Sequence, residues 1–262
     1  MPMAIFQFNS PIRLSVLLVA LCWNGWAAAD WQQYQARYAV YRNGNLVGKA
    51  DISFELQGER LVIRSDSNGT HGMARILGAS DNEYVEGRFS QGQFRPEHYT
   101  HHTRVAGIDD KWTADYDWSS NIVKITKDEE TLPLDLGPGA LDGLSLKLEL
   151  RRRLRDREPD LTFFLVDDEK IKQHVYQVLR TEQLETSLGC LQTVPVERVR
   201  TGSTRFTRAW HAPALDFITV RMEHGKTDGD HVEMRITELI VGQREVKPQP
   251  GCAAVQTSQA RP

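Results

Sequence analysis

The sequence predicts a mainly β protein: a large antiparallel meander that closes into a barrel or a strongly curved sheet, with one amphipathic helix in mid-chain. Three observations predict this fold. Apolar and polar residues alternate with period two in many short segments, hairpin-type turns separate these segments, and only one stretch has helical spacing. Closure is expected for so many short strands, because it removes exposed sheet edges.

The first 29 residues are interpreted as a cleavable secretory signal. Arg13 precedes an almost entirely apolar run at residues 14–21, and Ala27–Ala29 provides small side chains for cleavage before Asp30. The apolar run is too short to span a membrane, which takes about 20 residues. We therefore expect a periplasmic protein that has no transmembrane segment after signal cleavage.

Alternating segments then predict antiparallel strands with one buried and one solvated face, within a single β-rich domain at residues 30–242. The clearest apolar faces are Ala50, Ile52, Phe54 and Leu56; Trp112, Ala114, Tyr116 and Trp118; Ile218, Val220 and Met222; and Val232, Met234 and Ile236. Of these, we expect Ile52, Phe54, Trp112, Tyr116, Val220 and Ile236 to be mostly buried. Turn sequences at 43–45 and 227–230 separate neighbouring strands. We count about twelve to fourteen strands between Tyr34 and Val241.

One segment, at about residues 140–158, has helical spacing. Its apolar positions form two neighbouring stripes, Leu141, Leu144 and Leu148 on one and Leu146, Leu150 and Leu154 on the other. The polar positions are rich in arginine, so the helix either lies on an anionic surface such as lipid headgroups or, as we favour, packs on the sheet with a solvated basic face. Residues 243–262 contain three prolines and small polar residues and are predicted to be a disordered tail.

Charge and cysteine content limit the functional classes. The chain has 32 basic and 35 acidic residues, and removal of Arg13 with the signal leaves 31 basic residues. This mild acidity argues against nucleic-acid binding, which needs a concentrated basic surface. Cys22 leaves with the signal, so Cys190 and Cys252 remain, and they either form a disulfide in the oxidising periplasm or stay as two free thiols.

The order of elements resembles the bacterial secreted proteins called the domain of unknown function 3108 family, over roughly residues 34–242. The resemblance depends on five features: Tyr38-x-x-Tyr41, Gly44 with Leu46–Gly48, Leu141–Ser145, Glu185–Cys190, and Trp210 ahead of a strand pair ending at Glu238-Leu239. It implies an extracytoplasmic, β-rich domain. It implies no reaction, no cofactor and no catalytic residues.

No motif in the sequence predicts catalysis, a cofactor or a metal centre. There is no Gly-x-Ser-x-Gly nucleophile motif. His98 and His102 share a strand face but lie about 13 Å apart on an extended strand, and His101 points to the other face. We therefore expect that the protein is not an enzyme.

Two groups of side chains are candidates for ligand binding. Trp112, Tyr116 and Trp118 form an aromatic stripe that either lines a cavity or belongs to the core. Phe206, Arg208 and Trp210 share one face by alternation, so that an arginine accompanies two large aromatic rings. Such an arginine needs either a neighbouring carboxylate or an anionic ligand.

The function that we favour from the sequence is a non-enzymatic periplasmic protein that binds an apolar or lipid-like ligand in a β-barrel at the cell envelope. A large antiparallel barrel is a suitable container for such a ligand. The alternative is a structural or interaction protein with a filled core that acts through its surface on an envelope protein partner.

Overall fold

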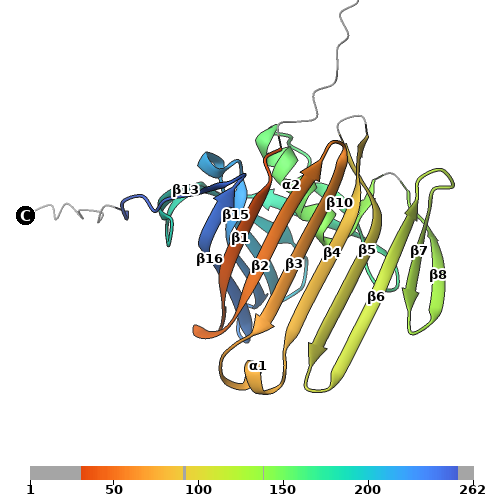
Figure 1. The fold of residues 1–262 in the computed structure, drawn as a ribbon, viewed down its shortest axis with the longest axis horizontal. Helices are drawn as coiled ribbons and strands as arrows, with labels where there is room; N and C mark the ends of the chain where they lie inside the picture. The colour runs from red at the N-terminus through yellow and green to blue at the C-terminus, as the bar shows by residue number, and fades with distance from the viewer. Residues whose placement is uncertain (1–30, 91–92, 138, 253–262) are drawn as a thin grey trace, which may run out of the picture.

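The structure, a computed structural model, describes residues 31–90, 93–137 and 139–252 (Figure 1). The predicted signal peptide lies outside the described residues. The described part is mainly β, as the sequence predicts, and contains seventeen strands, two α-helices and one short 3-10 helix.

Sixteen of the strands lie between Tyr34 and Val241. Their bounds are β1 Tyr34–Arg42, β2 Asn45–Gln57, β3 Arg60–Gly69, β4 Ser80–Ser90, β5 Gln93–Val105, β6 Ile108–Asp117, β7 Ile122–Lys127, β8 Glu130–Asp135, β9 Ala140–Leu141, β10 Thr162–Val166, β11 Ile171–Val178, β12 Glu182–Thr186, β13 Gly189–Val199, β14 Arg205–Ala212, β15 Ile218–Lys226 and β16 His231–Val241, followed by β17 Arg244–Glu245. The helices are α1 Gly72–Ile76, α2 Gly143–Arg155 and the 3-10 helix Pro213–Leu215. The sequence predicts fewer strands because β9, β10 and β12 are too short to display a clear alternation.

The strands form one large sheet that is antiparallel apart from a short parallel contact between β9 and β10. Successive hairpins connect β1 to β8 and, in a second series, β12 to β16, while β11 pairs with both β10 and β13. The two series join where the whole length of β1 pairs with β16. The spatial order is therefore β8 through β1, then β16 to β13, β11, β10 and β9.

The sheet is not closed, so the expected barrel closure is not confirmed. In the described residues, β8 pairs with β7 alone and β9 pairs with β10 alone. The two ends of the sheet nevertheless meet through side chains, because the Lys127 ammonium lies 2.7 Å from the Asp168 carboxylate and 2.9 Å from that of Asp110. Val166 of β10 also joins the hydrophobic cluster formed with β6 and β7. The sheet thus curves round on itself and leaves a seam without backbone pairing.

Helix α2 is shorter than predicted by about three residues at each end. It begins after Asp142, whose carboxylate accepts hydrogen bonds from the backbone N–H groups of Leu144 and Ser145, both at 2.9 Å. It ends at Arg155 and is followed by Asp156 and by Arg157, which adopts a left-handed backbone with φ of +57°. In Figure 1 the helix lies behind the front strands at their upper end. Its two leucine stripes contact different parts of the curved sheet, since Leu144 and Leu148 belong to one hydrophobic cluster and Leu146 and Leu150 to another.

We name these two parts the filled half and the open half. The filled half is the part of the inner face of β2–β7 where Leu144 and Leu148 of α2 complete one close cluster with Phe54, Ile63, Val85, Tyr99, Trp112, Tyr116, Val123 and Ile125. The open half is the inner face of β11 and β13–β16. Leu146 and Leu150, from the second stripe, face it.

Five of the six residues expected in the core are buried: Phe54, Trp112, Tyr116, Val220 and Ile236. Ile52 is only partly buried, because it borders the space inside the sheet. Period-two alternation therefore identifies the buried faces correctly, but it does not show whether the space beside them is filled.

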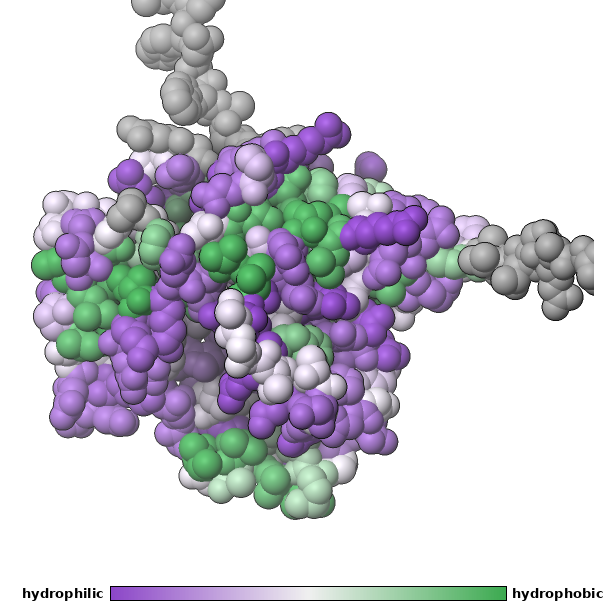
Figure 2. All heavy atoms as spheres, turned by 180° about the vertical axis from the view of Figure 1, so that it is seen from behind, coloured by the Kyte–Doolittle hydropathy of each residue, from purple (hydrophilic) through white to green (hydrophobic). Residues whose placement is uncertain are grey.

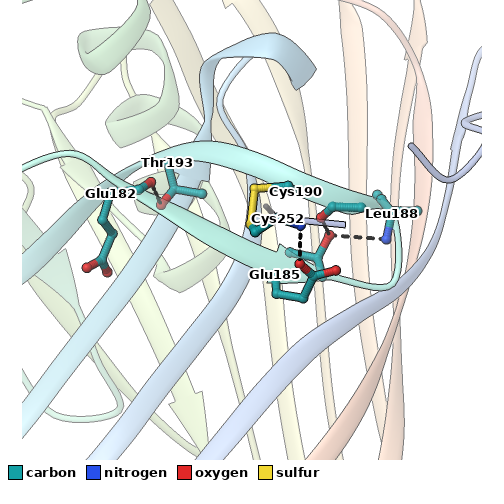
Figure 3. Close-up of a disulfide and its surroundings, with 8 residues drawn as sticks. Glu182, Glu185, Leu188, Cys190, Thr193 and Cys252 are labelled. Carbon is teal, nitrogen blue, oxygen red and sulfur yellow. Dashed lines mark hydrogen bonds between the residues drawn. A yellow bond between two sulfur atoms is a disulfide. The ribbon is translucent and has the colours of Figure 1, made fainter. Parts of the chain in front are cut away.

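The chain after Gln243 corrects the prediction of a disordered tail that begins there. Residues 243–252 follow the outer face of the sheet: Val246 N–H donates to the Leu239 carbonyl at 2.8 Å, and Gln249 N–H to the Leu188 carbonyl at 2.9 Å. Cys252 then forms a disulfide with Cys190, and its N–H donates to the Glu185 carboxylate at 2.5 Å (Figure 3). Backbone pairing and the disulfide hold this segment despite its prolines. Residues 253–262 lie outside the described residues.

The basic side chains of α2 have partners, so the helix does not present a free cationic face. Arg151 is buried, pairs with Asp216 and lies 4.8 Å above the Trp31 ring. Arg152 lies 2.8 Å from Glu149. In the described part of the chain, no helix is long and apolar enough to cross a membrane.

Candidate functional site

The inner face of the sheet borders a cavity of about 330 Å³ beside α2, lined by the open half and, across from it, by Ile52 of β2, Ser65 of β3 and Glu83 of β4. A second space of about 470 Å³ adjoins it toward α1, and the two share wall residues, among them Met222 and Met234. Figure 2, which shows the molecule from behind, displays a hollow in this face of the surface. Pockets for small ligands commonly measure roughly 300–1,000 Å³, so the enclosed space has the size of a binding site.

Most of the cavity wall is apolar. The larger apolar contributors are Ile52, Leu146, Leu150, Leu165, Met222 and Met234. The adjoining space adds a ring of small and branched side chains, Val40, Val47, Val105, Val232, Ala74 and Ala79. Small or polar side chains occupy the inner face of β14, where Thr207, Ala209 and His211 alternate. The small inward side chains Thr207 and Ala209, with Ser65 and Ser67 of β3, leave this space unfilled.

One side of the cavity carries a paired set of charges. Lys147 of α2 lies 3.0 Å from the Glu83 carboxylate, and the Tyr99 hydroxyl donates to the same carboxylate at 2.9 Å. Burial and the nearby Glu83 carboxylate raise the pKa of Tyr99 far above its usual value. These groups neutralise one another, so this side presents little net charge.

Two buried histidines on the wall are neutral at physiological pH. Burial lowers the pKa of His211 to about 4, and burial together with the charges of Arg198 and Arg200 lowers that of His174 to about 4. His211 Nδ1 lies 3.0 Å from the Phe217 carbonyl and must donate to it, which leaves Nε2 as an acceptor without a partner. His174 Nδ1 is likewise buried without a hydrogen-bond partner among the described residues.

The opposite side of the cavity carries two arginines, Arg198 of β13 and Arg200, which follows directly after that strand. Arg198 is the register partner of Tyr176 on β11. Arg200 donates to the Thr207 hydroxyl at 3.0 Å, and that hydroxyl lies 2.9 Å from His224 Nδ1. Sequence reasoning missed this group. A signal for it existed, because Val194, Val196, Arg198 and Arg200 alternate on one strand face, so an apolar face continues into two arginines.

None of the six residues predicted to bind a ligand lines this cavity. Trp112 and Tyr116 are buried in the filled half, where Trp112 lies 5.0 Å from Tyr99 between ring centres. Trp118 stacks on Tyr116 and donates to the Pro96 carbonyl at 2.7 Å. Trp112 and Tyr116 belong to the core in this structure and Trp118 packs against it, so the aromatic stripe does not line this cavity.

Phe206, Arg208 and Trp210 share one face of β14, as alternation predicts, but it is the outer face. Arg208 lies 2.5 Å from the Glu197 carboxylate and 5.7 Å above the Trp210 ring. Trp210 is buried by the β12–β13 hairpin, which folds back over the outside of the sheet, and its indole N–H donates to Glu182 at 2.5 Å. Arg208 therefore has the neighbouring carboxylate that the structural alternative requires, and these residues are not placed to bind a ligand in the cavity.

The three clustered histidines each contact a different carboxylate. His98 lies 2.7 Å from Asp115, His101 2.8 Å from Asp81, and His102 2.5 Å from Asp109. Among the described residues, one group has metal-ligand spacing, Glu185 with Cys190 and Cys252, but both sulfurs are committed to the disulfide (Figure 3). The potential metal ligands among the three histidines and in the Glu185–Cys190–Cys252 group therefore already have protein partners.

Comparison of folds gives three similar structures at low sequence identity. A β-barrel-like protein of the domain of unknown function 1849 family from Brucella abortus is 12% identical, with a TM-score of 0.56, and the match covers 80% of this chain and 98% of that one. A candidate lipoprotein from Parabacteroides distasonis has 11% identity, a TM-score of 0.33 and coverage of 80% and 96%. A candidate exported protein from Bacteroides fragilis with a YmcC-like fold has 9% identity, a TM-score of 0.30 and coverage of 80% and 94%. The match to the Brucella abortus protein shows that this chain has a similar fold.

No curated protein matches the sequence. A family model does match it, the protein of unknown function family DUF3108, over residues 33–237. This span includes the first sixteen strands almost completely, α2, and both halves of the sheet. The chain therefore belongs to the DUF3108 family.

Proposed function

We propose that the protein is a non-enzymatic carrier that holds an apolar or lipid-like ligand inside its curved sheet. The observation that carries this proposal is the cavity of about 330 Å³ with its largely apolar wall and its continuation toward α1. Protein interiors are normally close-packed, and side chains that border an empty space lose contacts. A ligand of matching shape would restore those contacts.

We propose further that the carrier works in the periplasm, at the cell envelope. Two features of the chain support this location: the predicted signal at residues 1–29 and the disulfide between Cys190 and Cys252. Disulfides persist in oxidising compartments such as the periplasm.

The alternative function is an interaction with an envelope partner through the surface. One observation favours it: Met73, Ile76, Leu77 and Ile108 are exposed near α1, and Figure 2 shows an apolar patch at that lower end of the molecule. Contiguous exposed apolar side chains are common at interaction sites. However, this patch lies beside the second space, whose wall includes Ala74 of α1. A carrier needs a place where ligand enters, so the patch fits both functions.

The test is a titration with N-phenyl-1-naphthylamine, an uncharged dye that fluoresces in apolar surroundings. We expect saturable binding by the wild-type protein and a loss of affinity of at least about tenfold in Ala209→Phe, which fills the cavity from β14. Phe206→Trp is the matched control, because it enlarges the outer face of the same strand. Equal binding by Ala209→Phe, or no binding by the wild type, contradicts the proposal.

A further inference from the structure

The wall of the open half gathers basic side chains from three nearby strands. Arg198 comes from β13, Arg200 follows directly after that strand, His174 comes from β11 and His224 from β15, and all four line the same cavity. The strands are hydrogen-bonded neighbours or separated by β14 alone. The Arg200–Thr207–His224 chain of hydrogen bonds fixes the position of one guanidinium.

Among the described arginines that are at least partly buried, these two differ in having no carboxylate partner. Every other arginine that is at least partly buried in the described residues forms an ion pair, namely Arg64, Arg151, Arg152, Arg153, Arg155, Arg208 and Arg221. Arg198 and Arg200 are partly buried and form none with any described carboxylate. Buried charges in proteins are normally paired.

The same group contains buried nitrogen atoms without hydrogen-bond partners. Arg200 Nη1 is one and His174 Nδ1 is another, and the His174 side chain is only 5% exposed. An unsatisfied buried polar atom costs about 1–3 kcal/mol, more when it is charged, so each such atom in a folded protein calls for an explanation.

The pKa shifts of these side chains also indicate excess positive charge on this wall. Burial and the charge of Arg198 lower the pKa of Arg200, and burial lowers that of Arg198. Both arginines also disfavour a proton on His174 and His224. Tyr176 faces this wall, and across the cavity lie Lys147 with its partner Glu83 and Asp81 with its partner His101. The nearby carboxylates of Glu197 and Asp167 are paired with Arg208 and Lys172. The wall therefore carries an uncompensated positive charge.

We infer that Arg198 and Arg200 bind the acidic head group, a carboxylate or a phosphate, of an amphiphile whose apolar part occupies the cavity. The inference rests on the proposed carrier function and specifies the chemical class of its ligand. A guanidinium presents a planar fork of N–H donors that matches either oxyanion. Leu146, Leu150, Leu165, Met222 and Met234 provide the apolar surface beside it.

The test compares two probes that differ in the head group alone, oleate and oleyl alcohol, each used to displace N-phenyl-1-naphthylamine. We expect wild-type protein to bind oleate at least about tenfold more tightly than the alcohol, since hydrogen bonds between charged groups are stronger than those between neutral ones. Arg198→Gln/Arg200→Gln should remove this preference and leave binding of the dye and the alcohol unchanged. Arg208→Gln, a change at the ion pair on the outer face, is the matched control and should keep the preference.

The outcomes separate the two claims. If dye and alcohol bind but oleate has no advantage, or if its advantage survives in the double variant, the head-group site is wrong and the carrier function stands. If neither probe binds, both claims fail. Arg198→Lys/Arg200→Lys keeps the charge and loses the fork, so a partial loss of preference in that variant supports the site even where the glutamine variant folds poorly.

Two further probes distinguish the sources of the acidic group. Oleoyl lysophosphatidic acid presents a phosphate on the same chain, and tighter binding than oleate would assign a phosphorylated lipid. Inorganic phosphate tests a free anion. Phosphate binding that is lost in the double variant, without any oleate preference in the wild type, would overturn the assignment of an amphiphile.

Discussion

The filled half and the open half are built from the same kind of strand and face the same helix, yet one is close-packed and the other encloses a cavity. On β6 of the filled half, Trp112, Ala114 and Tyr116 point inward and are buried. On β14 of the open half, the inward positions are Thr207, Ala209 and His211. The difference shows that in a curved sheet the size of the inward side chains, rather than their pattern, decides between core and cavity.

The largest expected effect is in the filled half. Trp112→Ala should lower the free energy of unfolding by about 3–5 kcal/mol, because it removes a large buried ring and its hydrogen bond to His101 at 3.0 Å. Urea denaturation measures it. A change below about 1 kcal/mol would mean that Trp112 lies beside empty space, and the comparison of the two halves would fail.

Removal of the disulfide should lower stability without changing either half of the inner face. Cys190→Ser/Cys252→Ser should lower the free energy of unfolding by up to about 4 kcal/mol, because the bond links residues 62 positions apart and restricts the unfolded chain. Dye binding in the open half should persist, since the disulfide lies at the outer face (Figure 3). Reductant should reproduce the loss in wild-type protein and leave the double variant unchanged.

The two halves should respond to pH in opposite directions. The lowered pKa of His211 in the open half, about 4, means that the unfolded chain takes up a proton that the folded chain does not. The resulting stabilisation is present above about pH 6.5 and is lost as the pH falls toward 4, by about 3 kcal/mol. His211→Gln should remove this acid loss, which denaturation at several pH values will measure.

His101, at the edge of the filled half, is the control. Its hydrogen bond to Asp81 raises its pKa, so its contribution to stability is present below about pH 6.5 and is lost as the pH rises through the raised value. His101→Gln should therefore lower stability at acidic pH more than at alkaline pH. The same pH dependence in both variants would contradict the assigned environments.

The smallest expected effects come from a matched pair of alanines on the inner face. Ala114→Phe should cost about 1–3 kcal/mol or more, because Ala114 is fully buried in a filled cluster. Ala209→Phe should change stability by no more than about 0.5 kcal/mol, since its side chain points into the cavity. Thermal unfolding of both variants measures the difference, and equal losses would mean that the open half has no room.

The sequence predicts the strands, α2 and the family well, because alternation and leucine spacing are local signals. It assigns Phe206, Arg208 and Trp210 to one face correctly, but Trp210 is buried by the β12–β13 hairpin on the outside, a contact that no local pattern contains. The docking of Cys252 is non-local in the same way. Arg198 and Arg200 are visible as an alternating pair, yet their lack of carboxylate partners depends on which strands lie opposite.

The central claim is that the cavity of the open half holds a ligand, and native mass spectrometry of protein purified from its own cell compartment tests it most directly. The account predicts a one-to-one adduct in the wild type, with a mass that lipid extraction assigns to an amphiphile, and loss of the adduct in Ala209→Phe. Wild-type protein that carries no adduct from its native compartment, or an adduct that persists when the cavity is filled, would contradict the account.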